Sequence, residues 1–228
     1  MRVSGGHLCR SARRKCPWGT EAPTEPAGER SPLLPGAEGE TLIQGGINLN
    51  AFVINCSPVR TGATARIAEI VIQELKKRFD TKSVCIDDYS FAFCKGCRSC
   101  HNTAKCVQSD DFDLLIAEFE KADVIVCISP SYWADIPGQF KAFIDRCTPW
   151  CNTHEPHAAL SSGKRGYTIA LRTGPSMKEC ERIIGSIEHF YGHLEIECCG
   201  SMGLCSIEYR EEVADRQDEI LKFCESIK

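Results

Sequence analysis

The sequence predicts an α/β protein with a doubly wound parallel sheet of five strands. From about residue 48 onward, short apolar runs of strand length alternate five times with amphipathic segments of helix length. That alternation is typical of a parallel sheet with helices on both faces. One run, residues 123–129, is apolar throughout, as expected of a central strand that is buried on both sides.

Composition is consistent with one large domain. The chain has 228 residues, 43% of them hydrophobic, and a formal net charge of −4 that argues against nucleic-acid binding. No apolar run approaches the ~18 residues that a membrane span needs, and no secretory signal is visible. We therefore expect a cytoplasmic protein without a membrane partner. Its 16 cysteines would then serve as metal ligands or small buried side chains.

Residues 1–47 do not have the pattern of a folded domain. They hold five of the eleven prolines and eight of the eighteen glycines, with almost no periodic apolar pattern. Such a segment buries too little surface to offset the entropy of ordering. We expect a disordered N-terminal extension over residues 1–47, or alternatively a targeting peptide, and a folded domain over residues 48–228.

The first predicted strand, residues 49–55, leads into a polar loop and then a helix at residues 65–75. Backbone N–H groups at the start of a helix are unpaired and attract anions, and nearby hydroxyls add donors. Neither the P-loop pattern nor the dinucleotide pattern G-x-G-x-x-G is present. The loop alone thus indicates either a phosphate site or an ordinary capped helix. Its candidate phosphate ligands are Ser57, Arg60, Gly62 and Thr64.

The later elements follow in the same alternation. Strands are predicted at residues 83–87, 123–129, 167–172 and 194–199, and helices at 111–121, 139–146, 177–191 and 208–227. The strand at 123–129 opens into a loop with two adjacent aromatic residues, which either flank a planar ligand or pack on the next helix. The residues of interest in that loop are Pro130, Ser131, Tyr132 and Trp133, and Gly174 lies in the loop after the strand at 167–172.

Four cysteines fall within thirteen residues between the second strand and the following helix: Cys94, Cys97, Cys100 and Cys106. A C-x2-C-x2-C run lets one loop wrap its thiolates around an iron–sulfur cluster, and the basic residues beside it favour the thiolate form. Three other interpretations compete. Zinc sites usually use two separated cysteine pairs, disulfides need an oxidising compartment, and the loop could also be an empty remnant of a cluster site.

The predicted topology brings two of these loops together. Right-handed crossovers place every strand-end loop at one edge of the sheet. In the flavodoxin-like strand order 2-1-3-4-5, a ligand binds where the order reverses, beside the first and third strands. The loop at 57–64 and the loop at 130–133 then meet at that edge. A phosphate cradle beside an aromatic pair suits flavin mononucleotide (FMN).

Three stretches resemble a known family. Residues 57–64 resemble the flavin-phosphate loop of the NADPH-dependent FMN reductase superfamily. Residues 122–132 and 141–146 are similar to its central strand and the helix that follows. The run at 94–106 resembles the cysteine motif of the iron–sulfur flavoproteins, a branch of that superfamily. The similarity covers about residues 48–228.

The resemblance implies a role for each candidate residue. Ser57, Arg60, Gly62 and Thr64 would hold the phosphate, Pro130, Ser131, Tyr132 and Trp133 would contact the ring, and Cys94, Cys97, Cys100 and Cys106 would ligate a [4Fe–4S] cluster. Gly174 is a further predicted cofactor contact, and no catalytic acid or base is predicted. One position departs from the family pattern: Cys56 stands where the family usually has glycine, and its side chain is expected to crowd the backbone beside the phosphate.

We predict an FMN-dependent electron-transfer oxidoreductase in which a [4Fe–4S] cluster passes electrons between a ferredoxin-like donor and FMN. The resemblance further implies a small-molecule acceptor (quinone, dioxygen or peroxide) and a homodimer or higher homo-oligomer with the flavin near the subunit interface. The alternative is an NAD(P)H-dependent FMN or quinone reductase with no cluster. A third hypothesis, from another class, is a non-catalytic zinc-binding interaction module.

Overall fold

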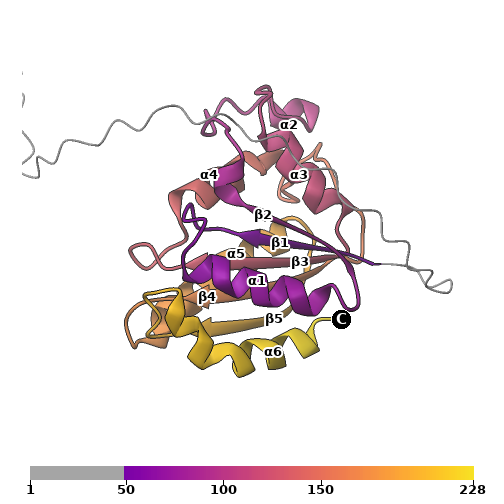
Figure 1. Ribbon diagram of the computed structural model, residues 1–228. Helices are drawn as coiled ribbons and strands as arrows, with labels where there is room; N and C mark the ends of the chain where they lie inside the picture. The colour runs from indigo at the N-terminus through magenta and orange to yellow at the C-terminus, as the bar shows by residue number, and fades with distance from the viewer. Residues whose placement is uncertain (1–48) are drawn as a thin grey trace, which may run out of the picture. The chain divides into compact units, whose positions relative to one another are not determined.

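The computed structural model describes residues 49–228, and the extension predicted over residues 1–47 lies outside that range. Within it, five parallel strands form one sheet in the order β2-β1-β3-β4-β5 (Figure 1), which confirms the predicted fold class and strand order. The strands are β1 (Asn50–Asn55), β2 (Asp80–Cys85), β3 (Val124–Pro130), β4 (Arg165–Leu171) and β5 (Glu197–Leu204).

Helices cover both faces of the sheet. On one face pack α1 (Ala63–Leu75) and α6 (Gln217–Ser226), and on the other α3 (Phe112–Lys121), α4 (Gly138–Arg146) and α5 (Met177–His193). Shorter elements are the 3-10 helices η1 (Ile86–Asp88), η2 (Thr148–Trp150) and η3 (Glu211–Arg216), and the single turn α2 (Cys100–Thr103) inside the cysteine loop. From residue 49 to the end of the chain, no helix has the length and apolar character needed to cross a membrane.

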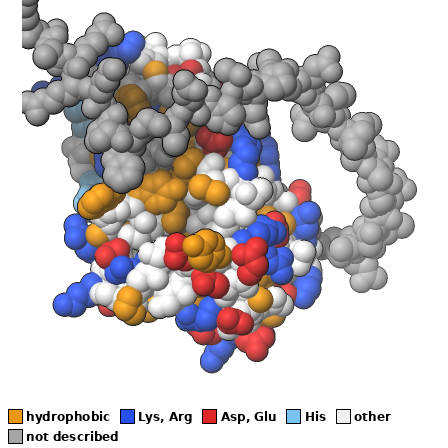
Figure 2. Space-filling view, turned by 60° about the vertical axis from the view of Figure 1, so that its left-hand side comes forward, with side chains coloured by type: hydrophobic (Ala, Val, Ile, Leu, Met, Phe, Trp, Pro, Cys, Tyr) orange, Lys and Arg blue, Asp and Glu red, His pale blue; other side chains and the backbone are white. Residues whose placement is uncertain are grey.

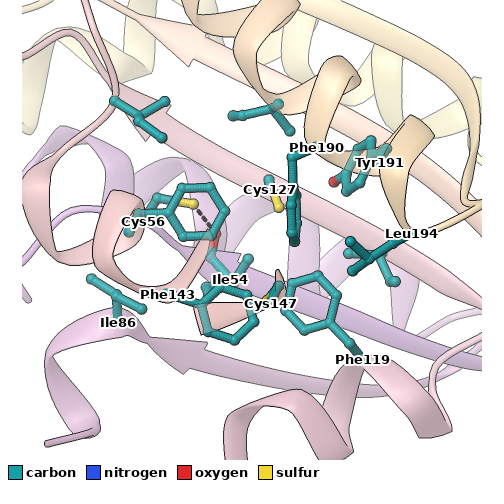
Figure 3. Packing of buried hydrophobic residues seen from close by; sticks show 14 of the residues in the cluster. Ile54, Cys56, Ile86, Phe119, Cys127, Phe143, Cys147, Phe190, Tyr191 and Leu194 are labelled. Atoms are coloured by element: carbon teal, nitrogen blue, oxygen red, sulfur yellow. Dashed lines mark hydrogen bonds between the residues drawn. The ribbon is translucent and has the colours of Figure 1, made fainter. Parts of the chain in front are cut away.

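The central strands are buried on both sides, and their residues alternate between two cores. On β1, Phe52 and Ile54 pack in the core under α3, α4 and α5, whereas Ala51 and Val53 pack in the core under α1 and α6. All four are at most 2% exposed. Figure 3 shows the aromatic side chains of the first core, where the Phe119 ring lies 5.1 Å from that of Phe143 and 6.1 Å from that of Phe190.

Three predicted elements have other bounds in the structure. The second strand runs over Asp80–Cys85 rather than residues 83–87, because the chain enters η1 at Ile86. The last strand runs over Glu197–Leu204 rather than residues 194–199, because α5 continues to His193 and the chain turns only afterwards. Its glycines hid it from a pattern search, yet the close approach of α5 requires the one at Gly203, where a Cβ would lie 2.4 Å from the Met177 sulfur and 2.9 Å from the Cys180 Cβ. The helix predicted at residues 208–227 is divided into η3 and α6.

Candidate functional site

The carboxyl ends of β1, β3 and β4 surround a cavity of about 190 Å³, called here the edge cavity. Six of the nine predicted cofactor residues line it: Ser57, Gly62, Thr64, Pro130, Ser131 and Tyr132. The topology therefore does bring the 57–64 loop and the 130–133 loop to one place. Arg60, Trp133 and Gly174 do not line this cavity.

The start of α1 is open to an anion. Gly62 occupies the N-cap position without a side chain to cap the helix, and the first turn carries no acidic residue. The backbone N–H groups in the first turn of α1 therefore have no side-chain cap, which leaves the positive end of the helix dipole open to an anion. Ser57 is buried and its Oγ accepts a hydrogen bond from the Val59 N–H at 3.1 Å, so the hydroxyl folds the loop beneath this helix start. The cavity thus fits a phosphate group.

Cys56 does not crowd this site, contrary to expectation. Its N–H donates to the Ile128 carbonyl at 2.9 Å, and its thiol points into the core, 3.8 Å from the Ile54 carbonyl oxygen (Figure 3). Burial, reinforced by the neighbouring Cys127 thiol, raises the pKa of Cys56 well above its usual value. The thiol is therefore neutral and adds no negative charge beneath the phosphate loop.

Arg60 is engaged with a neighbouring loop. Its guanidinium pairs with the carboxylate of Asp88 and lies 3.2 Å from that of Asp87, both on η1. The pair is about half exposed, and exposed pairs of this kind contribute at most about 1 kcal/mol. A phosphate in the edge cavity can therefore compete for Arg60, whose predicted role stays a prediction.

Trp133 stands at the tip of a strained turn. The N–H of Tyr132 donates to the Asp135 carbonyl at 2.8 Å, and Trp133 and Ala134 both have left-handed backbone, with φ of 55° and 60°. Turns of this kind favour glycine or asparagine, and a bulky residue there costs of the order of 1 kcal/mol. The indole is fully exposed. Strain that places an aromatic ring in solvent suggests that the ring meets a ligand or partner.

Figure 2 turns this edge of the molecule toward the viewer and shows hydrophobic side chains gathered on it. The large hydrophobic residues exposed in or beside the edge loops are Val59, Tyr132, Trp133 and Met177.

Sequence reasoning missed Arg172, which lines the edge cavity from the end of β4. Glu179 on α5 holds it: one carboxylate oxygen lies 2.8 Å from the Arg172 guanidinium, and the other accepts from the Ser131 hydroxyl at 2.8 Å. The Arg172 Nε is buried and has no hydrogen-bond partner within residues 49–228, so one donor of this guanidinium is unused. One signal in the sequence could have identified Arg172: it is the last residue of the strand predicted at 167–172, which the predicted strand order places beside the third strand.

Gly174 lies against Arg172. A Cβ on Gly174 would lie 2.2 Å from the Arg172 Nη2, so a larger residue here would displace the guanidinium. The predicted cofactor contact of Gly174 stays a prediction.

The four predicted cluster ligands line a second cavity, of about 270 Å³, called here the cysteine cavity. Three residues with left-handed backbone, Gly96, Arg98 and Ala104 (φ of 62°, 58° and 52°), fold the loop back on itself. The Gly96 N–H lies 3.5 Å from the Cys94 sulfur. The sequence thus brings together around one cavity the four thiols that the spacing singled out: Cys94, Cys97, Cys100 and Cys106.

The thiols differ in their surroundings. Hydrogen bonds from the backbone and hydroxyl of Ser99, with the charge of Lys95, lower the pKa of Cys97, whereas partial burial raises that of Cys100. Thiolate is the form that binds metal. Among residues 49–228, no three histidine, cysteine or acidic side chains converge on one point that could hold a single ion.

A third and larger cavity, about 570 Å³, lies between the cysteine loop and the loop after β3. Cys94 and Gly96 line one end of it, Asp135 and Ile136 the other, and α4 and α5 form its walls. The cysteine cavity and the edge cavity share no lining residue. Within one chain the two candidate cofactor sites are therefore separate, and this third cavity lies between the two loops.

The sheet order, the open start of α1 and the edge cavity define a flavodoxin-like fold with a cavity at the carboxyl edge of its sheet, the place where proteins of this fold bind their ligands. A family model described as NADPH-dependent FMN reductase matches residues 49–194. The chain belongs to this family.

Curated relatives bear the name iron–sulfur flavoprotein. One from Archaeoglobus fulgidus is 31% identical over 132 residues, which is 58% of this chain and 58% of that protein. One from Methanosarcina thermophila is 33% identical over 94 residues, 41% of this chain and 49% of that protein. The chain thus spans about half the length of these relatives. The predicted resemblance to the iron–sulfur flavoprotein branch is confirmed.

Solved structures share the fold at low identity. Smu.1420 from Streptococcus mutans superposes with a TM-score of 0.61 at 18% identity, covering 78% of this chain and all of that one. An FMN-dependent NADH-azoreductase from Bacillus anthracis, solved with FMN, gives a TM-score of 0.57 at 11% identity and covers 77% of this chain and 98% of that one.

Proposed function

We propose that this protein is an FMN-dependent electron-transfer oxidoreductase in which a [4Fe–4S] cluster on Cys94, Cys97, Cys100 and Cys106 passes electrons between a ferredoxin-like donor and FMN. The observation that carries the proposal is the convergence of these four thiols, out of all the cysteines of residues 49–228, on one cavity. When bound, the cluster supplies single-electron transfer and the flavin one- or two-electron transfer.

The protein's own residues supply binding and orientation at the edge cavity. The free N–H groups at the start of α1, with Ser57 and Thr64, fit the phosphate. Arg172 lines the cavity with a positive charge, and Glu179 holds both Arg172 and Ser131. The ring would then lie against Tyr132 and Trp133. No acid or base from the protein is needed for electron transfer.

The proposal extends to partners. The two cofactor cavities are separate within one chain, so a homodimer or higher homo-oligomer would let the cluster of one subunit approach the flavin of another. The donor would be a ferredoxin-like protein or NAD(P)H, and the acceptor a quinone, dioxygen or peroxide. The cysteines of residues 49–228 are all free thiols, which supports a reducing location such as the cytoplasm.

A second candidate is an NAD(P)H-dependent FMN or quinone reductase with no cluster. The observation that favours it is the family model described as NADPH-dependent FMN reductase, which matches residues 49–194.

Anaerobic purification with quantitation of iron, acid-labile sulfide and flavin distinguishes the hypotheses. About four irons and four sulfides per chain together with flavin is the expected result for a [4Fe–4S] cluster. Flavin without iron would establish the second candidate, and zinc without flavin would refute both.

A further inference from the structure

Arg146, the last residue of α4, carries a buried charge outside the flavin site. Its side chain is 0% exposed, and it is among the largest fully buried side chains of residues 49–228. A buried guanidinium must be paired and hydrogen-bonded, because an isolated buried charge is strongly disfavoured. Its partners therefore indicate what it is for.

Those partners are the two ends of the cysteine loop. On the entering side, Nη1 donates to the Ala92 carbonyl at 2.8 Å. On the leaving side, Nη1 and Nη2 donate to the Asp110 carboxylate at 2.9 and 3.1 Å, and Nη2 donates to the Gln108 carbonyl at 3.3 Å. One planar group thus ties both ends of the loop together. We call residues 92, 93, 108 and 110 the neck of the loop.

The neck is closed by two further bonds. The Asp110 carboxylate accepts from the Ala92 N–H at 3.1 Å, so the Arg146–Asp110 pair binds both backbone groups of Ala92. The Gln108 side-chain amide donates to the Phe93 carbonyl at 3.1 Å. Residues 94–107, which include all four cysteines, form the loop that begins and ends at this neck.

Arg146 also reaches the thiols. It lines the cysteine cavity together with the four cysteines, and its guanidinium lies 4.7 Å from the centre of the Phe112 ring, which fixes its plane. Its Nε is buried without a partner among the described side chains, so one N–H is unused by the neck. An arginine side chain is protonated at any ordinary pH, and Arg146 and Cys106 line the same cavity, so a fixed positive charge lies beside a cluster ligand.

We propose that Arg146 is the positioning residue of the cluster site: it closes the neck, which sets the spacing of the four sulfurs, and its charge raises the reduction potential of the bound cluster. The inference rests on the proposed function. Lysine cannot replace it fully, because a single ammonium lacks the planar fork that reaches Ala92, Gln108 and Asp110 together.

The test compares Arg146→Lys and Arg146→Met with the wild type. Arg78→Met is the control, because Arg78 also donates to two carbonyls, those of Cys224 and Ile227, and lies over a phenylalanine ring, but its partners belong to α6 and the residue after it, on the opposite face of the sheet from α4. Iron retention against a chelator and the cluster potential are measured on anaerobically reconstituted protein. Flavin content serves as the check on folding.

Both Arg146 variants should lose iron about 10- to 100-fold more readily than wild type, as is usual when a residue that supports metal ligands is removed. The cluster potential should fall in Arg146→Met and stay near the wild-type value in Arg146→Lys, a split that a merely structural role would not produce. Arg78→Met should match wild type in both. Gln108→Ala removes the bond from the Gln108 amide to the Phe93 carbonyl and should show a smaller loss of iron than the Arg146 variants. It replaces Arg146→Met if that variant fails to fold.

Wild-type iron retention and potential in both Arg146 variants would overturn the proposal and leave the proposed function standing. A wild-type protein that never takes up iron would instead refute the proposed cluster. The neck would then still be judged by hydrogen exchange: unchanged exchange over residues 93–107 in Arg146→Met would show that Arg146 does not hold the loop.

Discussion

The loops around the edge cavity continue the hydrogen-bond ladder of the sheet. The Ser131 N–H donates to the Leu171 carbonyl at 2.8 Å, and the Arg172 N–H donates to the Leu204 carbonyl at 3.0 Å. The cysteine loop has no strand beside it. Phe93 and Val107, which flank its cysteines, are 76% and 62% exposed. The loop is attached through the neck around one buried arginine and through the His101 ring, which stacks on that of His154 at 4.2 Å.

This comparison shows that the two sites are held in place by different parts of the fold. The edge cavity inherits its geometry from a sheet whose unfolding would be global, whereas the cysteine loop can open locally without disturbing the core. Flavin binding and cluster binding should therefore fail independently. Each prediction below tests or refines that separation.

The largest effect is expected from Cys97→Ser. A serine hydroxyl does not replace a thiolate ligand, so the broad visible absorption of the cluster and the bound iron should be lost. Flavin should remain, because Cys97 lines only the cysteine cavity. The control is Cys199→Ser, an exposed cysteine on β5. Joint loss of iron and flavin in Cys97→Ser would contradict two separate sites.

Next in size is Gly62→Asp at the start of α1. A carboxylate at this N-cap position repels a phosphate, and we expect FMN to bind about tenfold more weakly, or about 1.4 kcal/mol. The melting temperature should hold or rise, because aspartate is a good N-cap. The new Cβ would lie 3.1 Å from the exposed Val59 side chain, which can move.

Riboflavin, which lacks the phosphate, is the matched ligand for this variant. Its affinity, measured by the same fluorescence titration, should not change. An equal loss for FMN and riboflavin would place the phosphate elsewhere.

A smaller effect is expected from Trp133→Asn. Asparagine tolerates left-handed backbone, so the flavin-free protein should be stabilised by roughly 1 kcal/mol. FMN should bind about fivefold more weakly, since stacking on an aromatic ring contributes around 1 kcal/mol. Thermal unfolding without flavin and a flavin titration measure the two. A rise in stability without any change in flavin affinity would show that the indole serves something other than the ring.

The smallest effect is a pH dependence of the neck. Burial alone would raise the pKa of Asp110, but hydrogen bonds from Arg146, Ala92 and Phe112 outweigh it and lower that pKa. Its stabilising contribution is then complete above the unfolded carboxyl value of about 3.9 and is lost as pH falls through the folded pKa. In thermal unfolding, the melting temperature of the wild type should be higher than that of Asp110→Asn at pH 7, and the difference between the two melting temperatures should shrink toward pH 3. A difference in melting temperature that does not change with pH would mean that the negative charge of Asp110 does not stabilise the neck.

Much of the fold followed from local pattern. Uninterrupted apolar runs marked β1 and β3 because a strand covered on both faces has no polar side. The alternation with amphipathic helices then indicated the layers, whereas the strand order was taken from the flavodoxin-like pattern. The last strand was predicted wrongly because its Gly203 is required by the close packing of α5, and no local sequence pattern indicates that contact.

By itself, the sequence determined the fold class, the phosphate loop and the cysteine spacing, since each is written in residues a few positions apart. Only the tertiary structure decided that Cys56 points into the core, that Glu179 holds Arg172 and that Arg146 closes the neck. Arg146 and Ala92 are 54 residues apart and Glu179 and Ser131 are 48 apart. Such contacts depend on how whole elements pack, and that information appears only once the chain has folded.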